Sequence, residues 1–314
     1  MFATLNVVLP VFALILVGWL ARKLNILGGN ALTELNRFVV FMALPALLFD
    51  IIANARWADL AQPAFIATFS IGMMVVFFLT MLVQLRRTRH LADAAIDGLN
   101  VGYANTGFIG FPLALVFLGH GSLAPTLIAT ILTVSVLFGI GIVIIETGLQ
   151  GEVRRHIILG RVLKSLLRNP LLVSPVIAVF VPALGLEVPD AVNVFLKLLG
   201  GAASPCALIA LGLFLASQPP RKTKDGNVTI TMLVALKLLV QPLLTWWLAT
   251  SVFNLPALLV HTAVLLAALP TGTGPFMLAE FYQREAVTTS RCVLISTILS
   301  LFTLSFYLYI IRGA

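Results

Sequence analysis

The sequence predicts an all-α membrane protein in which ten transmembrane helices form two five-helix inverted repeats. Three observations lead to this fold class. The chain is 60% hydrophobic and 10% charged, with a mean hydropathy of +1.06, whereas soluble domains carry about 25% charged residues. Apolar segments long enough to cross a bilayer recur along it. Proline and glycine interrupt two of these segments, at corresponding places in the two halves.

Ten segments are candidate spans, although the sixth is short and the fourth and ninth are interrupted. The first lacks the basic n-region and cleavage site of a signal peptide, so we expect a retained helix. We treat residues 1–314 as one transmembrane domain, with repeats at 1–148 and 170–314 and a cytoplasmic linker at 149–169. The approximate spans are 5–21, 35–54, 62–85, 94–118, 122–148, 170–184, 191–216, 229–253, 256–282 and 286–311.

Basic residues predict the orientation, because they concentrate in the odd-numbered loops. The even loops hold Arg56 and the acidic pair Glu187 and Asp190. By the positive-inside rule the odd loops are cytoplasmic and both termini lie outside. This placement accounts for most of the net charge of +8, so it does not indicate a nucleic-acid partner. The residues are Arg22, Lys23, Arg37, Arg86, Arg87, Arg89, Arg154, Arg155, Arg161, Lys164, Arg168, Arg221, Lys222, Lys224, Arg284 and Arg291.

The two halves repeat one another at an offset of about 165 residues. Pro45 in the second span corresponds to Pro205 in the seventh, and Gly107 in the fourth corresponds to Gly272 in the ninth. Five spans is an odd number, so the second half has the opposite topology to the first. Inverted repeats of this kind are typical of secondary transporters.

The first interruption is the stretch Tyr-Ala-Asn-Thr-Gly-Phe-Ile-Gly-Phe-Pro at residues 103–112. Pro112 cannot donate a backbone hydrogen bond and clashes with the preceding turn, so a helix should break here. Lipid cannot pair the freed backbone groups, which therefore must lie inside protein or beside a watery cavity. A proline kink in an ordinary span is the alternative, because membrane helices tolerate such kinks.

The second interruption, at residues 268–276, reads Ala-Leu-Pro-Thr-Gly-Thr-Gly-Pro-Phe. Two matched breaks point to a transport site. We expect Pro112 and Pro275 to open the second half of each broken helix, where unpaired N–H groups and the helix dipole favour an anion. The predicted substrate-binding residues are Asn105, Thr106, Gly107, Gly110, Pro112, Pro270, Thr271, Gly272, Thr273, Gly274 and Pro275.

Ionisable residues inside spans are functional candidates, and snorkelling from an interface is the alternative. Lys237 is deep enough for either interpretation, and Glu280 is either a proton carrier or an interfacial cap. For Lys197, Asp50 and Glu146, near span ends, snorkelling is favoured. Cys206 lies in a polar run that indicates helix packing or contact with the crossing of the two breaks.

Enzymatic and cofactor chemistry finds little support. Cys206 and Cys292 both sit in spans, which argues against a disulfide framework. The four histidines lack the spacing of metal ligands, and no Walker or dinucleotide motif occurs. The sequence predicts no catalytic residue, no metal and no cofactor. The Thr-Gly-Thr-Gly run at 271–274 faintly resembles a potassium filter, but its flanking prolines fit a broken helix better.

The motifs together resemble those of the auxin efflux carrier family, over nearly the whole chain and in order. They are Asn-Arg-Phe-Val at 36–39, Leu-Pro at 44–45, Asn-Thr-Gly-Phe-Ile-Gly-Phe-Pro-Leu at 105–113, Arg-Asn-Pro at 168–170, Leu-Gly-Leu-Phe at 211–214, Ala-Leu-Pro at 268–270 and Gly-Pro-Phe at 274–276. The family includes plant PIN-type auxin exporters and bacterial permeases for small organic acids.

The resemblance implies crossed fourth and ninth helices, an elevator-like motion and a homodimer. It also implies that Asn105 contacts the substrate carboxylate. The central linker is short here and long in many plant members, which indicates a bacterial-type carrier in the inner membrane and argues against auxin itself as the substrate.

Three functions compete at this stage. The first is a secondary carrier of small organic anions, the second a passive anion channel or pore, and the third an intramembrane enzyme, for which no nucleophile–base pair is found in the spans. The breaks hold no carboxylate to pair with a cation, and helix N-termini disfavour one. Proton coupling through Lys237 or Glu280, or uncoupled uniport, is therefore favoured over sodium coupling.

Overall fold

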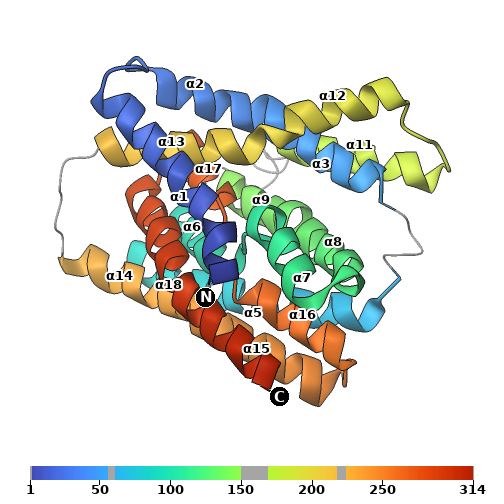
Figure 1. The fold of residues 1–314 in the computed structure, drawn as a ribbon. Coiled ribbons are helices and arrows are strands. Elements are labelled where there is room, and N and C mark those ends of the chain that lie inside the picture. Colours follow the sequence, from blue (N-terminus) through green and yellow to red (C-terminus); the bar gives the residue numbers. More distant parts are fainter. Residues whose placement is uncertain (1, 56–60, 150–168, 218–223, 314) are drawn as a thin grey trace.

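The computed structural model describes residues 2–55, 61–149, 169–217 and 224–313, and they are helical almost throughout (Figure 1). Six helices among them are long and apolar enough to cross a membrane. Their ranges are Ala31–Ala53, Pro63–Arg87, His120–Leu149, Asp190–Ser217, Asn227–Val252 and Ala286–Ile311. Three shorter apolar helices are Thr106–Leu118, Pro170–Ala183 and Ala257–Ala267.

The helices succeed one another with short connections. Those before the predicted linker are α1 (Phe2–Lys23), α2 (Ala31–Phe38), α3 (Leu44–Ala53), α5 (Pro63–Thr88), α6 (Leu91–Gly102), α7 (Phe111–Leu118), α8 (Leu123–Ile131) and α9 (Phe138–Leu149). Those after it are α11 (Pro170–Ala183), α12 (Asp190–Gly201), α13 (Ala203–Ser217), α14 (Lys224–Ala235), α15 (Gln241–Trp247), α16 (Ala257–Ala267), α17 (Gly274–Phe281) and α18 (Ala286–Gly313). The predicted linker lies almost wholly outside the described residues.

Proline explains three of the joints between helical segments. Pro45, Pro112 and Pro242 each stand second in a helix that directly follows a π-helical turn. A proline inside a helix removes one hydrogen bond and pushes against the carbonyl four residues earlier. A π turn widens the backbone at that point, so the helix continues past the proline with a local bulge.

The helices form two groups, which occupy the upper and lower parts of Figure 1. The frame helices are α1, α2, α3, α11, α12 and α13, in which α1 packs along α13 while α3 packs against α11 and α12. The crossing helices are α5 to α9 and α14 to α18, in which α6 packs between α5 and α9. Each group draws on both halves of the sequence.

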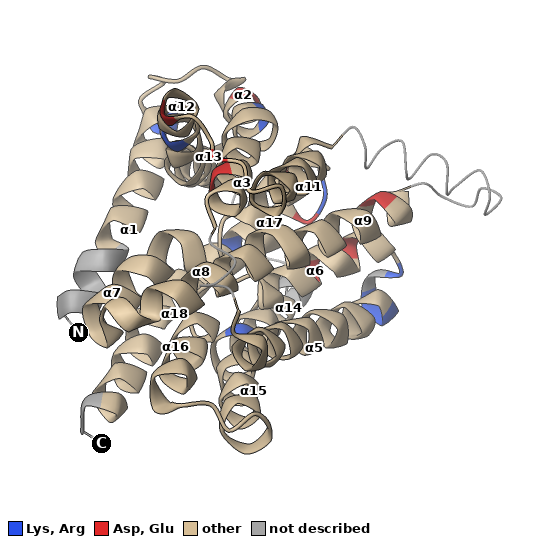
Figure 2. Cartoon of the chain, turned by 90° about the vertical axis from the view of Figure 1, so that its right-hand side faces the viewer, with Lys and Arg blue, Asp and Glu red and all other residues tan. Residues whose placement is uncertain are grey.

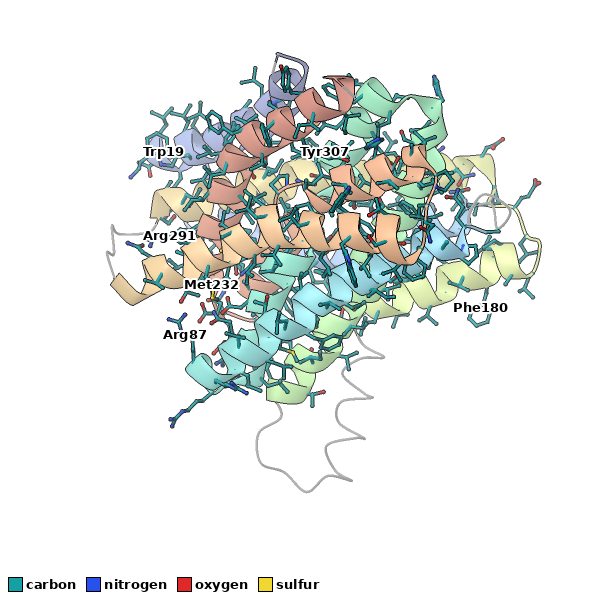
Figure 3. The ribbon with its side chains drawn as sticks, turned by 90° about the horizontal axis from the view of Figure 1, so that it is seen from below. Trp19, Arg87, Phe180, Met232, Arg291 and Tyr307 are labelled. Atoms are coloured by element: carbon teal, nitrogen blue, oxygen red, sulfur yellow. The ribbon has the colours of Figure 1, made fainter. Side chains whose placement is uncertain are left out.

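The outer surface is apolar over much of its area, as expected for a protein surrounded by lipid. Figure 2 shows how few charged residues the helices carry. Large apolar side chains remain exposed, including Phe306 at 67% and Phe180 at 58%, and Phe180 projects away from the bundle in Figure 3. Arg87, at the end of α5, also points outward, away from the other helices.

Candidate functional site

The two interruptions predicted from the sequence meet in space. α6 ends at Gly102 and α16 at Ala267, and the extended segments after these ends run antiparallel, with Ala104 opposite Thr271. The backbone N–H of Asn105 donates to the carbonyl of Pro270 at 3.0 Å, and the N–H of Gly272 donates to the carbonyl of Tyr103 at 3.0 Å. The breaks therefore satisfy part of each other's backbone polarity, which lipid could not do.

Tyr103 explains why glycine stands at two positions of the second break. A Cβ on Gly272 or on Gly274 would lie 2.7 Å from a carbon of the Tyr103 ring. The ring is buried and packs against Phe138, with centroids 5.4 Å apart, so it has little freedom to withdraw. The close approach of the two extended segments thus depends on residues without a side chain.

A cavity of about 310 Å³ opens at this crossing. One wall belongs to the crossing helices and includes Asn105, Thr106, Gly107 and Thr273. The other wall comes from the frame helices and is mostly apolar; it consists of Val39, Leu44, Leu47, Ile51, Gly200, Gly201, Ala203, Ser204 and Ala207. The candidate site therefore lies between the two groups of helices.

The crossing wall presents hydrogen-bond donors to this cavity. The helical turn that resumes the first broken helix begins at Thr106, and the first N–H groups of a helix have no partner within it. The buried hydroxyl of Thr106 also has no hydrogen-bond partner. Thr273 caps the start of α17 from the second break. These donors and the two helix dipoles favour an anion at this point.

The predicted site residues separate into those that line the cavity and those that support it. Asn105, Thr106, Gly107 and Thr273 line it. The supporting residues are Gly110, which packs under Leu266 and Leu269, and the buried residues Pro270, Thr271, Gly272, Gly274 and Pro275 behind the crossing.

The expectation that Pro112 opens the second half of the fourth span is wrong. The helix resumes at Thr106, as a π turn that runs into α7, because that turn accommodates the proline within a continuing helix. The expectation for Pro275 is confirmed, since it is the second residue of α17.

Lys237 and Gln241 lie at the ends of the two half-helices that precede the breaks. The Lys237 ammonium donates to the carbonyl of Ala267, the last residue of α16, at 3.2 Å. The Gln241 amide donates to the carbonyl of Gly102, the last residue of α6, at 3.3 Å, and its oxygen accepts a hydrogen bond from Lys237. A cation and a donor at helix C-termini oppose the negative end of each dipole.

The other two residues predicted for coupling or support lie outside the cavity wall. Glu280 faces a separate pocket with Gln283 and Glu285 and accepts a hydrogen bond from Gln283 at 3.3 Å. Cys206 is half-buried on α13, between Ser204 and Ala207, which do line the cavity.

Sequence reasoning missed several polar residues around the crossing. Ser204 and Thr130 line the cavity, and Asn100 accepts a hydrogen bond at its carbonyl from the Thr271 hydroxyl at 2.6 Å. Asp97 is 1% exposed within α6. A signal for Asp97 existed, because an ionisable residue inside an apolar span is a functional candidate by default.

Comparison with known proteins identifies the family. The family model described as "Membrane transport protein" matches residues 3–308. A "Putative malonate transporter" of Rhizobium meliloti is 31% identical over 310 residues, covering 98% of this chain and 96% of that protein. An "Uncharacterized transporter" of Methanothermobacter thermautotrophicus is 29% identical over 304 residues, 95% of each chain.

The likeness extends in part to plant proteins. A "Probable auxin efflux carrier component 1b" of Oryza sativa subsp. japonica is 31% identical over 162 residues, which are 50% of this chain and 29% of the rice protein. The family match over nearly the full chain and the apolar helices agree with each other. The chain is therefore an integral membrane protein of the membrane transport protein family that includes the auxin efflux carriers.

Proposed function

We propose that this protein is a secondary transporter of small carboxylates, which bind in the cavity at the crossing of the two broken helices. The observation that carries the proposal is the meeting of both breaks at one cavity, with the donors of Thr106, Thr273 and Asn105 on its wall. The printed name of the Rhizobium relative supports a dicarboxylate, malonate, as the first ligand to test. The protein has a carrier's role here and no catalytic one.

The proposed architecture is two inverted repeats of five spans. In this assignment α6 and α7 form the fourth span, and α16 and α17 form the ninth. The cavity between frame and crossing helices supports an elevator-type motion, in which the crossing helices carry the ligand past the frame. Two copies of the chain would form a homodimer in the bacterial inner membrane, with lipid around both.

The structure of the helix ends argues against sodium coupling. Unwound carbonyls at half-helix C-termini are where transporters of this general type hold sodium. Here Lys237 and Gln241 already donate to the last carbonyls of α16 and α6. Carboxylate uptake into proteoliposomes should therefore be unaffected by an imposed sodium gradient. Strict dependence on sodium would contradict this prediction.

Ligand-induced stabilisation tests the proposed function directly. A ligand that binds the folded state alone raises the apparent unfolding temperature of the detergent-purified protein. Malonate and other small carboxylates should do so, whereas uncharged analogues such as the diamide should not. Proteoliposomes should then show saturable uptake with counterflow of labelled malonate. Linear, unsaturable flux would instead favour a passive anion pore, and a protein that neither binds nor moves any carboxylate would contradict the proposal.

The orientation of the chain has its own test. With both termini outside, the end of α5 lies in the cytoplasm. A cysteine in place of Arg87, in a background with Cys206 and Cys292 replaced by serine, should react with an impermeant maleimide only after the cells are opened. A cysteine at Asn254, on the opposite side, should react in intact cells. The reverse pattern would overturn the topology.

A further inference from the structure

A buried carboxyl group lies behind the crossing, on the side away from the cavity. Asp97 is 1% exposed, and its Oδ2 accepts a hydrogen bond from the Gln84 side chain of α5 at 2.6 Å. Its other oxygen, Oδ1, has no hydrogen-bond partner. The Asn100 side chain stands next to this carboxyl, donates to the Thr289 hydroxyl of α18 at 3.0 Å, and leaves its own oxygen without a partner.

The arrangement lacks one donor. Two adjacent buried oxygens, Asp97 Oδ1 and Asn100 Oδ1, are both acceptors, and leaving buried acceptors unsatisfied costs about 1–3 kcal/mol each. A protonated carboxylic acid has one O–H donor as well as acceptor capacity. A proton on Asp97 would supply the donor that Asn100 lacks, and it would also remove an isolated negative charge from a buried site.

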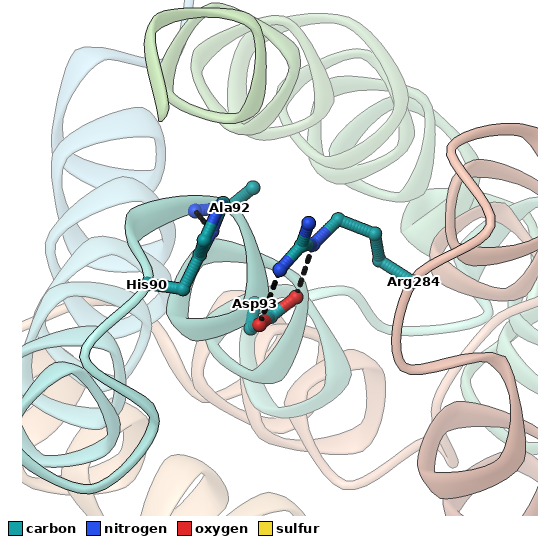
Figure 4. A network of polar contacts seen from close by, with 4 residues as sticks. All are labelled: His90, Ala92, Asp93 and Arg284. Carbon is teal, nitrogen blue, oxygen red and sulfur yellow. Dashed lines mark hydrogen bonds and ion pairs between the residues drawn. The ribbon is translucent and has the colours of Figure 1, made fainter. Parts of the chain in front are cut away.

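The charged neighbours of Asp97 do not supply a counter-ion. Asp93, one turn earlier on α6, is paired with Arg284, whose second contact measures 2.8 Å (Figure 4). The hydrogen bonds to Asp93 raise the pKa of Arg284, which lies in the loop before α18, so the pair stays ionised. Glu285 adds a second negative charge near Asp97, and the facing residue of α18 is the thiol Cys292.

The carboxyl is connected to the candidate site through one residue. The carbonyl of Asn100 accepts the hydrogen bond of the Thr271 hydroxyl, and the backbone N–H of Thr271 donates to Ser296 at 3.1 Å. Thr271 pairs with Ala104, directly before Asn105 of the cavity wall. Asp97 and a bound anion would therefore stand on opposite sides of the same crossing.

We infer that Asp97 is the proton-binding site of this transporter, and that its proton travels together with the carboxylate. The inference rests on the proposed function. A negative charge on Asp97 and a negative ligand at the crossing repel each other, so protonation favours anion binding. By reciprocity, anion binding favours protonation to the same extent. The protonated, anion-loaded crossing is the form that moves, which makes the transporter a proton–anion symporter.

The experiment uses liposomes that contain the reconstituted protein and a trapped pH indicator. Adding malonate outside, without a pH gradient, should acidify the lumen of liposomes with the unsubstituted protein. Asp97→Asn, which imitates the neutral acid, should exchange labelled malonate across the membrane but move protons no faster than protein-free liposomes. Glu146→Gln is the matched control, because Glu146 bonds Tyr282 at the far end of α9 and its replacement should keep proton movement.

A second measurement examines the linkage itself. Stabilisation of the unsubstituted protein by malonate should increase as the pH falls, and Asp97→Asn should lose that dependence. Asp97→Ser serves the same purpose if Asp97→Asn does not elute as a folded protein. Malonate uptake without proton uptake, or proton uptake retained in both variants, would overturn the inference while the proposed function stands. Absence of malonate binding and transport in the unsubstituted protein would instead contradict the proposed function.

Discussion

Gly212→Ala should lower the unfolding temperature of the purified protein strongly, because no space exists for a Cβ where α13 crosses α1. A Cβ on Gly212 would lie 2.0 Å from the carbonyl oxygen of Ile15, and one on Gly18 would lie 2.1 Å from the carbonyl oxygen of Ile209. Both obstacles are backbone atoms, which a rotamer change cannot move. Small residues allow membrane helices to approach this closely.

The cost of such overpacking is about 1–3 kcal/mol and sometimes more. We expect Gly212→Ala at or above the upper end, since the two helices must separate. Gly201→Ala is the control, because nothing lies within 4 Å of the added Cβ and alanine is a better helix former than glycine. Its unfolding temperature should be unchanged or slightly higher. Equal unfolding temperatures for the two variants would show that α1 and α13 do not pack as described.

Asn105→Ala should weaken malonate binding by about 1.5–3 kcal/mol, the range for a hydrogen bond to a charged group. This corresponds to a loss of affinity of about tenfold to over a hundredfold. Asn105 lies on the cavity wall where the two extended segments cross, and its backbone N–H is already used by Pro270. Its side-chain amide is therefore the group free to donate to a carboxylate.

The measurement for Asn105→Ala is the dissociation constant of malonate, determined by calorimetry on protein that elutes as a folded species. Asn54→Ala is a suitable control, because Asn54 lies at the end of α3 and bonds Asp50 and Asn193, away from the cavity. Unchanged affinity in a folded Asn105→Ala protein would show that the carboxylate binds elsewhere.

The class of the protein and the positions of the two breaks could be predicted from the amino-acid sequence. Hydropathy is a local property, so apolar segments could be located without any knowledge of their neighbours. Proline and glycine act on the backbone at their own positions, which is why residues 103–112 and 268–276 could be recognised as interruptions. The motifs within and around them were enough to indicate the family, which the match over residues 3–308 confirms.

Local rules were less reliable for the point at which a helix resumes after a break. Pro112 was expected to begin a new half-helix, but a π turn from Thr106 carries the helix through it. Whether a proline ends a helix or is accommodated depends on whether the bulged turn finds room among its neighbours. In this case Gly110 leaves that room beside Leu266 and Leu269, which belong to the other broken helix.

The polar groups that meet at the crossing are brought together by the packing of helices far apart in the chain. Thr271 bonds Asn100, Gln241 bonds Gly102, and Asn100 bonds Thr289, although these partners are separated by 171, 139 and 189 residues. The sequence placed Thr271 in the cavity, whereas its hydroxyl turns to the opposite side, toward the network that contains Asp97. A buried hydroxyl or amide bonds whichever partner the packing of distant helices brings within reach, and no pattern along the chain records that choice.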